Sequence, residues 1–315
     1  MTRRPTLRLA VLIALLTPPM LVTAGSAGAV DVEESAIRSS PTAVSLPADC
    51  TPTAPFKVGT FPHRPRVTNK WLPLVPGTNF VMEGTVVEEG VTHQHRIVTT
   101  VTDLTKTINR VRSVVVFDRD FDNGELQESE LAFMAQDANK RVWNVGEYPE
   151  VYADGKLKGA PSTWIAGVEQ ARAGIGMQPV PRVGSAAYLQ GVAPKVDFRD
   201  CARVVQTDQR VCVPVRCYHH VLVTEEWAPL DPEGGHQLKY YAPGVGNIKV
   251  GAVGGDSAEV LQLSALKRLN GKDLAAVRKQ VLEQDSRGYQ VSPNVYGRTA
   301  RAQRASCWGR THGGV

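Results

Sequence analysis

The chain has 315 residues, of which 42% are hydrophobic, and its formal net charge is +5. This composition is sufficient for a packed core and excludes a chain that is disordered throughout. The charge is uneven, because residues 266–315 contain ten Lys and Arg against three Asp and Glu. Since three arginines also lie within residues 1–8, residues 30–265 carry about −5.

Residues 1–29 have the pattern of a secretory signal peptide. A basic start precedes an apolar run, and small residues ending at Ala29 offer a cleavage site. Pro18 and Pro19 interrupt the run, which disfavours a membrane-spanning helix. We therefore expect a secreted protein, with the Sec and twin-arginine routes both open. Residues 30–55 are rich in Ala, Ser, Pro and Thr without an apolar period, and predict a disordered linker.

Residues 56–265 contain short runs of Val, Ile, Thr and aromatic residues between Gly, Asp, Asn and Pro. Such runs are typical of antiparallel strands joined by turns. They predict a mainly β domain, built as a curved sheet or half barrel. Within it, residues 149–195 are rich in Pro and Gly and predict a long irregular insertion.

The acidic stretch DRDFDNGELQESE, from Asp118 to Glu130, resembles a calcium loop only in part. An EF-hand loop needs Gly at its sixth position and Glu at its twelfth, where this stretch has Asn123 and Ser129. Asn123-Gly124 instead predicts a tight hairpin, with residue 122 opposite 125 and residue 120 opposite 127. Alternation places four acids on one face, which we interpret as solvated, with a surface divalent-cation site as the weaker alternative: Asp118, Asp120, Asp122 and Glu125.

Aromatic residues are scattered through and beside the insertion. We interpret them as local core, and alternatively as a platform for an apolar or sugar ligand. They are Tyr148, Tyr152, Trp164 and Tyr188.

Five cysteines in an exported chain leave one unpaired. Cys212 and Cys217 enclose a short turn between two β-like runs, so we predict a disulfide at the tip of a hairpin. The sequence does not pair Cys50, Cys201 and Cys307.

The C-terminal region predicts a helix over residues 266–288, with Asp273 as a capping residue and Gly288 at its end, followed by an extended basic tail over 289–315. No acid follows Asp285. We therefore expect the tail to bind an anionic cell-wall polymer or membrane surface, and no specific nucleic acid. The tail arginines concerned are Arg298, Arg301, Arg304 and Arg310.

Two segments carry a resemblance to known proteins. WLPLVPGTNFVMEG (71–84) resembles the opening strand of exported bacterial β proteins, and YYAPGVGNIKV (240–250) resembles their closing hairpin. Similar segments occur in LolA-like lipoprotein-carrier folds, and the whole chain resembles a family of secreted actinobacterial proteins. The resemblance implies an exported half-barrel fold and supplies no catalytic residue.

The sequence lacks the common nucleophile, phosphate-loop and zinc-protease motifs. We therefore expect a secreted, non-catalytic β protein without a cofactor, which binds a ligand or a cell-envelope polymer. The alternatives are an extracellular hydrolase that uses carboxylates on the sheet face, and a structural envelope protein without a ligand. Oligomeric state is left open.

Overall fold

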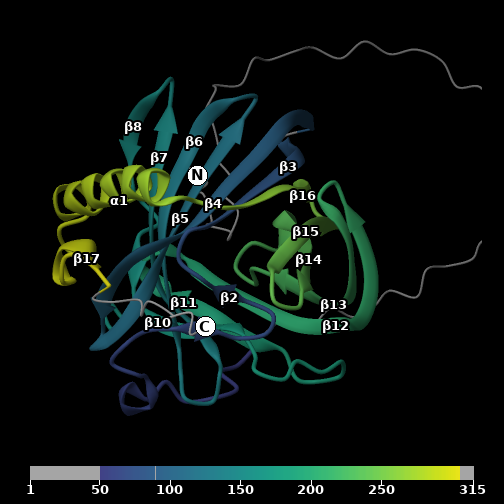
Figure 1. Ribbon diagram of the computed structural model, residues 1–315, viewed down its shortest axis with the longest axis horizontal. Coiled ribbons are helices and arrows are strands. Elements are labelled where there is room, and N and C mark those ends of the chain that lie inside the picture. The colour runs from purple at the N-terminus through teal and green to yellow at the C-terminus, as the bar shows by residue number, and fades with distance from the viewer. Residues whose placement is uncertain (1–49, 89, 306–315) are drawn as a thin grey trace, which may run out of the picture.

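The computed structural model describes residues 50–88 and 90–305. Within these residues twelve antiparallel strands close into a barrel, because β10 pairs with both β11 and β7. The expected curved sheet or half barrel is therefore corrected to a closed barrel (Figure 1). The barrel strands are β3 (Thr78–Glu88), β4 (Val91–Ile108), β5 (Val111–Asp122), β6 (Glu125–Gln136), β7 (Val142–Ala153), β10 (Arg172–Met177), β11 (Tyr188–Ala193), β12 (Phe198–Val213), β13 (Arg216–Trp227), β14 (His236–Ala242), β15 (Gly246–Val253) and β16 (Ala258–Arg268).

Closure depends on the segment 149–195, which is not irregular as expected. It contains two barrel strands, β10 and β11, and two short outer strands, β8 (Lys156–Gly159) and β9 (Trp164–Ile165). Register shifts in β10 and β11 break the alternating pattern that would have marked them as strands. Gly174 is required where β10 meets β11, since a Cβ there would lie 2.2 Å from the Gln190 carbonyl carbon.

One end of the barrel is crossed by the segment that contains β1 (Val67–Thr68) and β2 (Pro73–Leu74). Asn69 fixes this segment: its side-chain amide donates to the carbonyls of Lys140 and Gln178, each at 3.0 Å. The buried side chains of Val67 and Leu74 join the apolar cluster inside the barrel. This end of the lumen is therefore lined by packed apolar side chains.

Helix α1 (Gly271–Val291) lies against the outer face of the barrel (Figure 1). It begins after Asn270, whose side chain accepts hydrogen bonds from the backbone of Lys272 and Asp273; Asn270, not Asp273, is the cap. The helix continues through Gly288, its expected end. A Cβ at Gly288 would lie 2.5 Å from the Tyr296 ring, so this glycine serves the packing of the helix. No helix in the described part of the chain is long and apolar enough to span a membrane.

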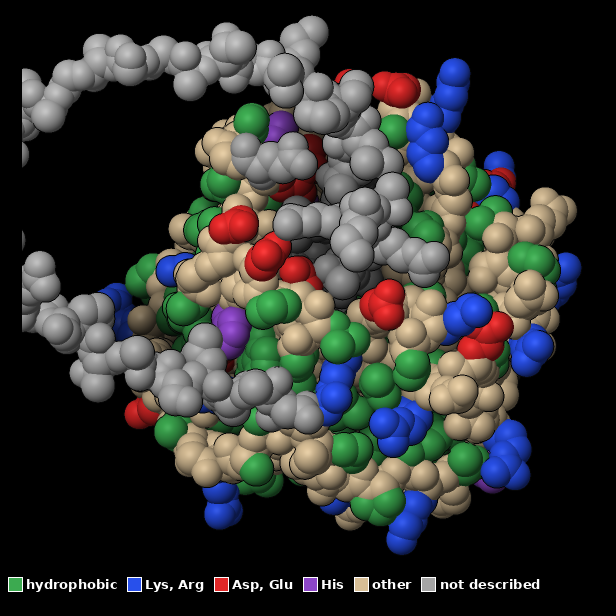
Figure 2. Space-filling model, turned by 180° about the vertical axis from the view of Figure 1, so that it is seen from behind, with side chains coloured by type: hydrophobic (Ala, Val, Ile, Leu, Met, Phe, Trp, Pro, Cys, Tyr) green, Lys and Arg blue, Asp and Glu red, His purple; other side chains and the backbone are tan. Residues whose placement is uncertain are grey.

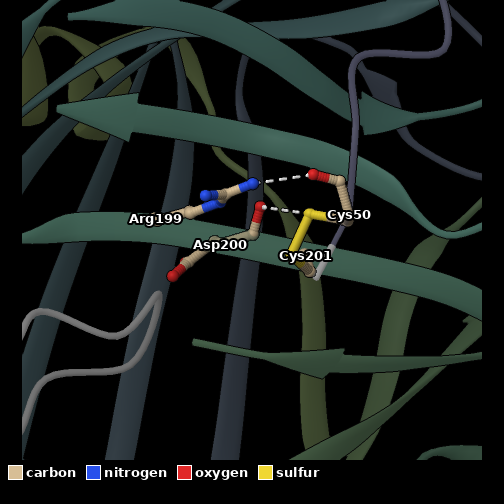
Figure 3. Close-up of a disulfide and its surroundings, with 4 residues drawn as sticks. All are labelled: Cys50, Arg199, Asp200 and Cys201. Carbon is tan, nitrogen blue, oxygen red and sulfur yellow. Dashed lines mark hydrogen bonds between the residues drawn. A yellow bond between two sulfur atoms is a disulfide. The ribbon is translucent and has the colours of Figure 1, made fainter. Parts of the chain in front are cut away.

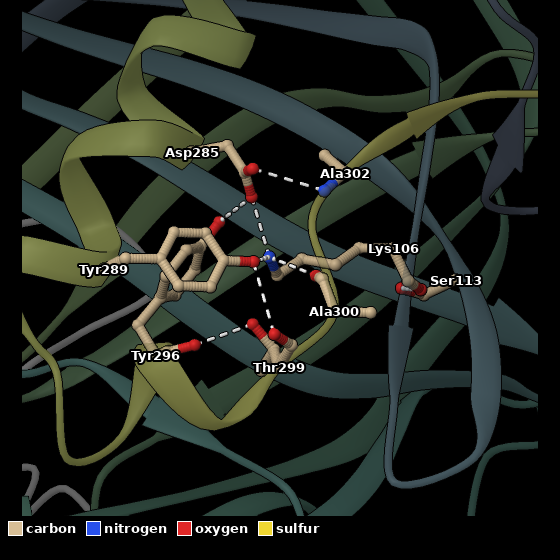
Figure 4. A network of polar contacts seen from close by, with 8 residues as sticks. All are labelled: Lys106, Ser113, Asp285, Tyr289, Tyr296, Thr299, Ala300 and Ala302. Carbon is tan, nitrogen blue, oxygen red and sulfur yellow. Dashed lines mark hydrogen bonds and ion pairs between the residues drawn. The ribbon is translucent and has the colours of Figure 1, made fainter.

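A buried ion pair joins α1 to β4 and to the segment that follows the helix (Figure 4). The Lys106 ammonium donates to Asp285 at 2.7 Å, to the Tyr289 hydroxyl at 3.0 Å and to the Ala300 carbonyl at 2.8 Å. Farther along, β17 (Gln303–Arg304) pairs with β4. Residues 289–305 are therefore docked on the barrel and do not form the extended tail that we expected; residues 306–315 lie outside the described residues.

The described residues contain two disulfides. The expected Cys212–Cys217 bridge joins residues that face each other on β12 and β13. A second bridge joins Cys50 to Cys201 on β12, 151 residues away (Figure 3). The Arg199 guanidinium also donates to the Cys50 carbonyl at 2.9 Å. The last residues of the expected linker, 50–55, are thus attached to the barrel, while its residues 30–49 and the expected signal peptide lie outside the described residues.

Candidate functional site

The barrel lumen contains a cavity of about 200 Å³. Eight-stranded barrels are just filled by their own side chains, so a barrel of twelve strands has room for a lumen. One part of the cavity wall is apolar and includes Leu72, Leu74, Phe80, Met82, Val116 and Met134. The other part is charged and includes Asp118, Asp120, Glu128, Glu130, Glu226, Lys239 and Glu259.

The acids of β5 and β6 form two facing pairs on one wall of the lumen. Asp118 lies opposite Glu130, and Asp120 lies opposite Glu128. The Asn123-Gly124 turn is confirmed by positive φ at both residues. A register shift next to Asp120 replaces its expected partner, residue 127, by Glu128.

This acidic face is not solvated, which corrects the interpretation made from the sequence. Asp120 is 6% exposed and Glu128 is 2% exposed. The sequence pattern indicated a solvated face because it does not show that both faces of β5 are covered. Its outer residues Val115 and Phe117 belong to the core cluster that α1 joins, while its inner residues face the lumen. Apolar residues on both faces of a strand were the available signal for its burial.

Several buried oxygens of this wall have no hydrogen-bond partner within the described residues. They are Asp118 Oδ1, Asp120 Oδ1 and Glu128 Oε2. A buried polar atom without a partner costs about 1–3 kcal/mol, so most such atoms in proteins bind protein groups or ordered water. The three oxygens therefore mark a place where a water molecule or a ligand group is bound favourably.

Burial changes the ionisation of the wall. It raises the pKa of Asp118 to about 6 and that of Asp120 to about 8. Burial also raises the pKa values of Glu128 and Glu130 well above the ordinary range, and neighbouring acids add to this effect. For Asp118, a hydrogen bond from Thr99 partly offsets the increase. Asp120 therefore retains its proton to higher pH than an ordinary Asp, and the same direction holds for the other three carboxyls.

The basic groups of the lumen contact other acids. His95 Nδ1 lies 2.6 Å from Asp122 and its Nε2 lies 3.0 Å from Glu259. Burial lowers the pKa of His95, but these carboxylates outweigh burial and raise it to about 10. The Lys239 ammonium lies 3.0 Å from Glu226.

Glu147 on β7 is another deeply buried acid, but both of its oxygens accept hydrogen bonds. Asn144 donates to one at 2.5 Å and the Trp164 indole donates to the other at 2.8 Å. Burial raises the pKa of Glu147, which these bonds partly offset. Glu147 thus differs from the β5–β6 acids in having its hydrogen-bonding capacity used by the protein.

The aromatic candidates from the sequence are not gathered around the cavity. Tyr148 is fully buried, with its ring 4.4 Å from that of Tyr296, and donates to Glu150 at 2.8 Å. Tyr152, which is partly buried, donates to the other Glu150 oxygen at 2.8 Å. Trp164 stacks on Phe198 at 5.0 Å. Tyr188 is 1% exposed. None of these four candidates lines the cavity.

The four weak metal candidates occupy different surroundings. Asp118 and Asp120 face the lumen, Asp122 contacts His95, and Glu125 is exposed beside the hairpin turn. Among residues 50–88 and 90–305, no group of three or more His, Cys, Asp or Glu has the arrangement of a metal site.

The outer surface shows a different distribution of charge. On the face in Figure 2, several acidic side chains lie near the middle, whereas most Lys and Arg lie toward the edge. The acidic lumen thus belongs to a chain with a positive net charge and a largely basic periphery on this face.

No protein-family model and no curated protein sequence matches the chain. Among solved structures, it is similar to a Bacteroides fragilis protein with a YmcC-like fold that is thought to be exported. The identity is 14%, the match covers 63% of this chain and 99% of that one, and the TM-score is 0.36. A Parabacteroides distasonis protein that is thought to be a lipoprotein matches at 11% identity, with the same coverage of 63% and 99% and a TM-score of 0.34. These distant likenesses carry no functional argument.

Proposed function

We propose that the protein is an exported, non-catalytic β-barrel that binds a small, partly apolar molecule in its lumen. The observation that carries the proposal is the cavity of about 200 Å³, which is apolar over one part of its wall and has unpartnered buried oxygens on the other. Ligand sites are typically apolar cavities with a few polar groups that fix orientation. An apolar ligand part contributes affinity through burial of its surface, at about 25 cal/mol per Å².

Export is supported by the signal pattern of residues 1–29 and by the two disulfides, since stable disulfides are typical of proteins in oxidising compartments. A carrier role, which the resemblance to lipoprotein-carrier folds implies, would use the same lumen. The size of the cavity favours a small molecule over an envelope polymer.

Hydrolysis by paired carboxylates is the alternative from the sequence. A glycosidase needs two carboxyls that flank the bond to be cleaved. The pairs Asp118–Glu130 and Asp120–Glu128 instead lie side by side on neighbouring strands of one wall.

The test is to fill the lumen. Ala132 is buried, lines the cavity, and lies opposite Val116 on β5. Binding of n-hexanol and n-hexylamine to the mature protein would be measured by calorimetry for the wild type, for Ala132→Trp and for the smaller change Ala132→Leu. Val180→Trp, at a position that is 63% exposed, is the matched control.

We expect the wild type and the control to bind at least one probe, Ala132→Leu to bind more weakly and Ala132→Trp not to bind. Circular dichroism checks that each variant is folded. Equal binding by the wild type and a folded Ala132→Trp variant would place the probes outside the lumen, and a wild type that binds neither probe would contradict the proposal.

A further inference from the structure

We infer that the lumen ligand carries a protonated amine or guanidinium group, which lies against the facing carboxyls of β5 and β6 while its apolar part lies against the apolar wall. The inference rests on the proposed lumen binding and adds the chemical class of the ligand.

The first observation is geometric. Two carboxyl pairs, Asp118–Glu130 and Asp120–Glu128, follow each other along one ladder and all four residues line the cavity. Asp120 and Glu128 are more than nine-tenths buried, and each has an oxygen without a hydrogen-bond partner among the described residues. A cation with several N–H donors can satisfy such acceptors in a way that the apolar wall cannot.

The second observation concerns charge. Within the described residues, none of these four acids forms an ion pair with a Lys, Arg or His side chain. The nearby bases contact other acids: His95 contacts Asp122 and Glu259, and Lys239 contacts Glu226. His95 and Lys239 therefore lower the pKa values of Asp120 and Asp118 only from a distance, and the adjoining cavity has room for a cation in direct contact with these carboxyls.

Other ligand classes fit this wall less well. At the pH of the experiment below, near 8, the ionised members of the pairs would repel an anion. A metal ion is disfavoured because the described residues contain no group with the arrangement of a metal site. A neutral alcohol can donate a single hydrogen bond, whereas an ammonium group has three donors and a charge.

Binding of the cation is an exchange. The ligand ammonium enters, and carboxyl protons leave to the solvent as the carboxylates that face the ligand ionise. No bond to carbon forms or breaks. Because burial raises the pKa values of these carboxyls, they ionise progressively as pH rises, and affinity for a cation should increase with pH until the wall is ionised.

The experiment compares three probes with the same apolar chain and different head groups: n-hexylamine, n-hexanol and hexanoate. Calorimetry near pH 8, the pKa of Asp120, measures their affinities for the mature wild-type protein. We expect the amine to bind about tenfold to a hundredfold more tightly than the alcohol, as for a hydrogen bond to a charged group, and hexanoate to bind most weakly. Repeating the amine titration in buffers of different ionisation enthalpy should reveal net proton release.

Two nearly isosteric variants, Asp120→Asn and Glu128→Gln, test the wall itself. Each should lower the preference for the amine over the alcohol several-fold and reduce the proton release. Glu125→Gln removes an exposed acid of the same hairpin and should leave both unchanged. Binding of n-hexanol to the two lumen variants shows that they are folded and that the cavity is intact.

The outcomes separate the two proposals. If neither hexanol nor hexylamine binds the wild type, lumen binding itself is contradicted. If hexanol binds in the lumen but the amine binds no more tightly, the inference of a cationic ligand is wrong. The same holds if Asp120→Asn and Glu128→Gln keep the full preference for the amine. In both cases the proposed binding site in the lumen is not contradicted.

Discussion

Asp120 and Glu128 face each other across the β5–β6 ladder inside the barrel, and each has a buried oxygen without a partner among the described residues. Two like charges directly opposite each other in a ladder destabilise a sheet. Burial strengthens this effect, because it disfavours the ionised form of each carboxyl. The pair is therefore stable in the empty protein mainly while it retains protons.

The stability of the ligand-free protein should consequently fall as pH rises. A carboxyl whose pKa is higher in the folded state stabilises the fold below its unfolded pKa and loses this contribution as pH rises through the folded pKa. For Asp120 this window extends from the ordinary value of 3.8 to about 8. His95 lowers the Asp120 pKa, whereas Glu259, Asp118 and Asp122 raise it.

Thermal unfolding between about pH 5 and about pH 8.5 measures this effect. We expect Asp120→Asn to show a smaller decrease in melting temperature than the wild type, and to be the more stable of the two at the alkaline end. Glu125→Gln should follow the wild type. Parallel curves for Asp120→Asn and the wild type would show that Asp120 does not titrate differently in the folded and unfolded states.

Calcium should not stabilise the protein. The register of the acidic stretch fails for a calcium loop, and the described residues contain no metal-site arrangement of His, Cys, Asp and Glu. Melting temperatures with calcium and with an excess of chelator should therefore agree. A clear decrease on chelation would show that a divalent cation is part of the folded protein.

The two disulfides should contribute unequally to stability. On the chain-entropy account, a bridge across 151 residues contributes about 5 kcal/mol and one across 5 residues contributes about 2 kcal/mol. Replacing Cys50 and Cys201 by Ser should therefore lower the free energy of unfolding more than replacing Cys212 and Cys217. Urea unfolding measures the difference, and non-reducing peptide mapping verifies the pairing. An equal or reversed order would show that native contacts outweigh loop closure.

The Lys106–Asp285 pair should be important for the docking of α1. Their side chains are 0% and 3% exposed, so Lys106→Met leaves Asp285 buried without its cation and should destabilise the protein by about 3–5 kcal/mol. Adding Asp285→Asn should recover part of this loss. Lys279→Met, which removes an 80% exposed lysine from the same helix, is the control and should change stability little. A small effect of Lys106→Met in urea unfolding would contradict this role.

Local signals predicted the parts of the fold that depend on neighbouring residues. Asn123-Gly124 predicted its hairpin because both residues accept positive φ, and the Cys212–Cys217 bridge was predicted because its two residues flank one turn. The helix was predicted from its apolar period, although its start depends on Asn270 rather than on Asp273.

Features that depend on distant residues were missed. Closure of the barrel is a β7–β10 pairing, which no local pattern encodes, and Cys50 pairs with a residue 151 positions away. The candidate site was missed for the same reason. Asp118 and Asp120 were predicted to lie on the same face of a strand, but the sequence could not show that this face lies inside a closed barrel.

The basic residues after α1 provide the last prediction, which concerns binding to an anionic surface. Arg298 and Arg301 are exposed, although the surrounding segment is docked, and Arg310 lies outside the described residues. Arg304 is also exposed, but it lies 3.3 Å from Asp103, so its charge is offset locally and it is left unchanged in the test. Deleting residues 289–315 would also remove the Ala300 carbonyl that accepts a hydrogen bond from Lys106. Weaker wall binding by a truncated protein could therefore result from lower stability instead of from the loss of the arginines. Substitution is the better test.

We expect the protein to bind purified cell walls at low ionic strength and to lose this binding near 1 M salt, where the Debye length is about 3 Å. Changing Arg298, Arg301 and Arg310 together to Gln should weaken the binding, because these side chains supply positive charge that no acid after Asp285 offsets. Changing the same residues to Lys should preserve it, since non-specific attraction depends on charge and not on the shape of the guanidinium group. Co-sedimentation of the three proteins with walls measures the effect. If the Gln variant binds as the wild type does, or if salt has no effect, the arginines are not the binding surface.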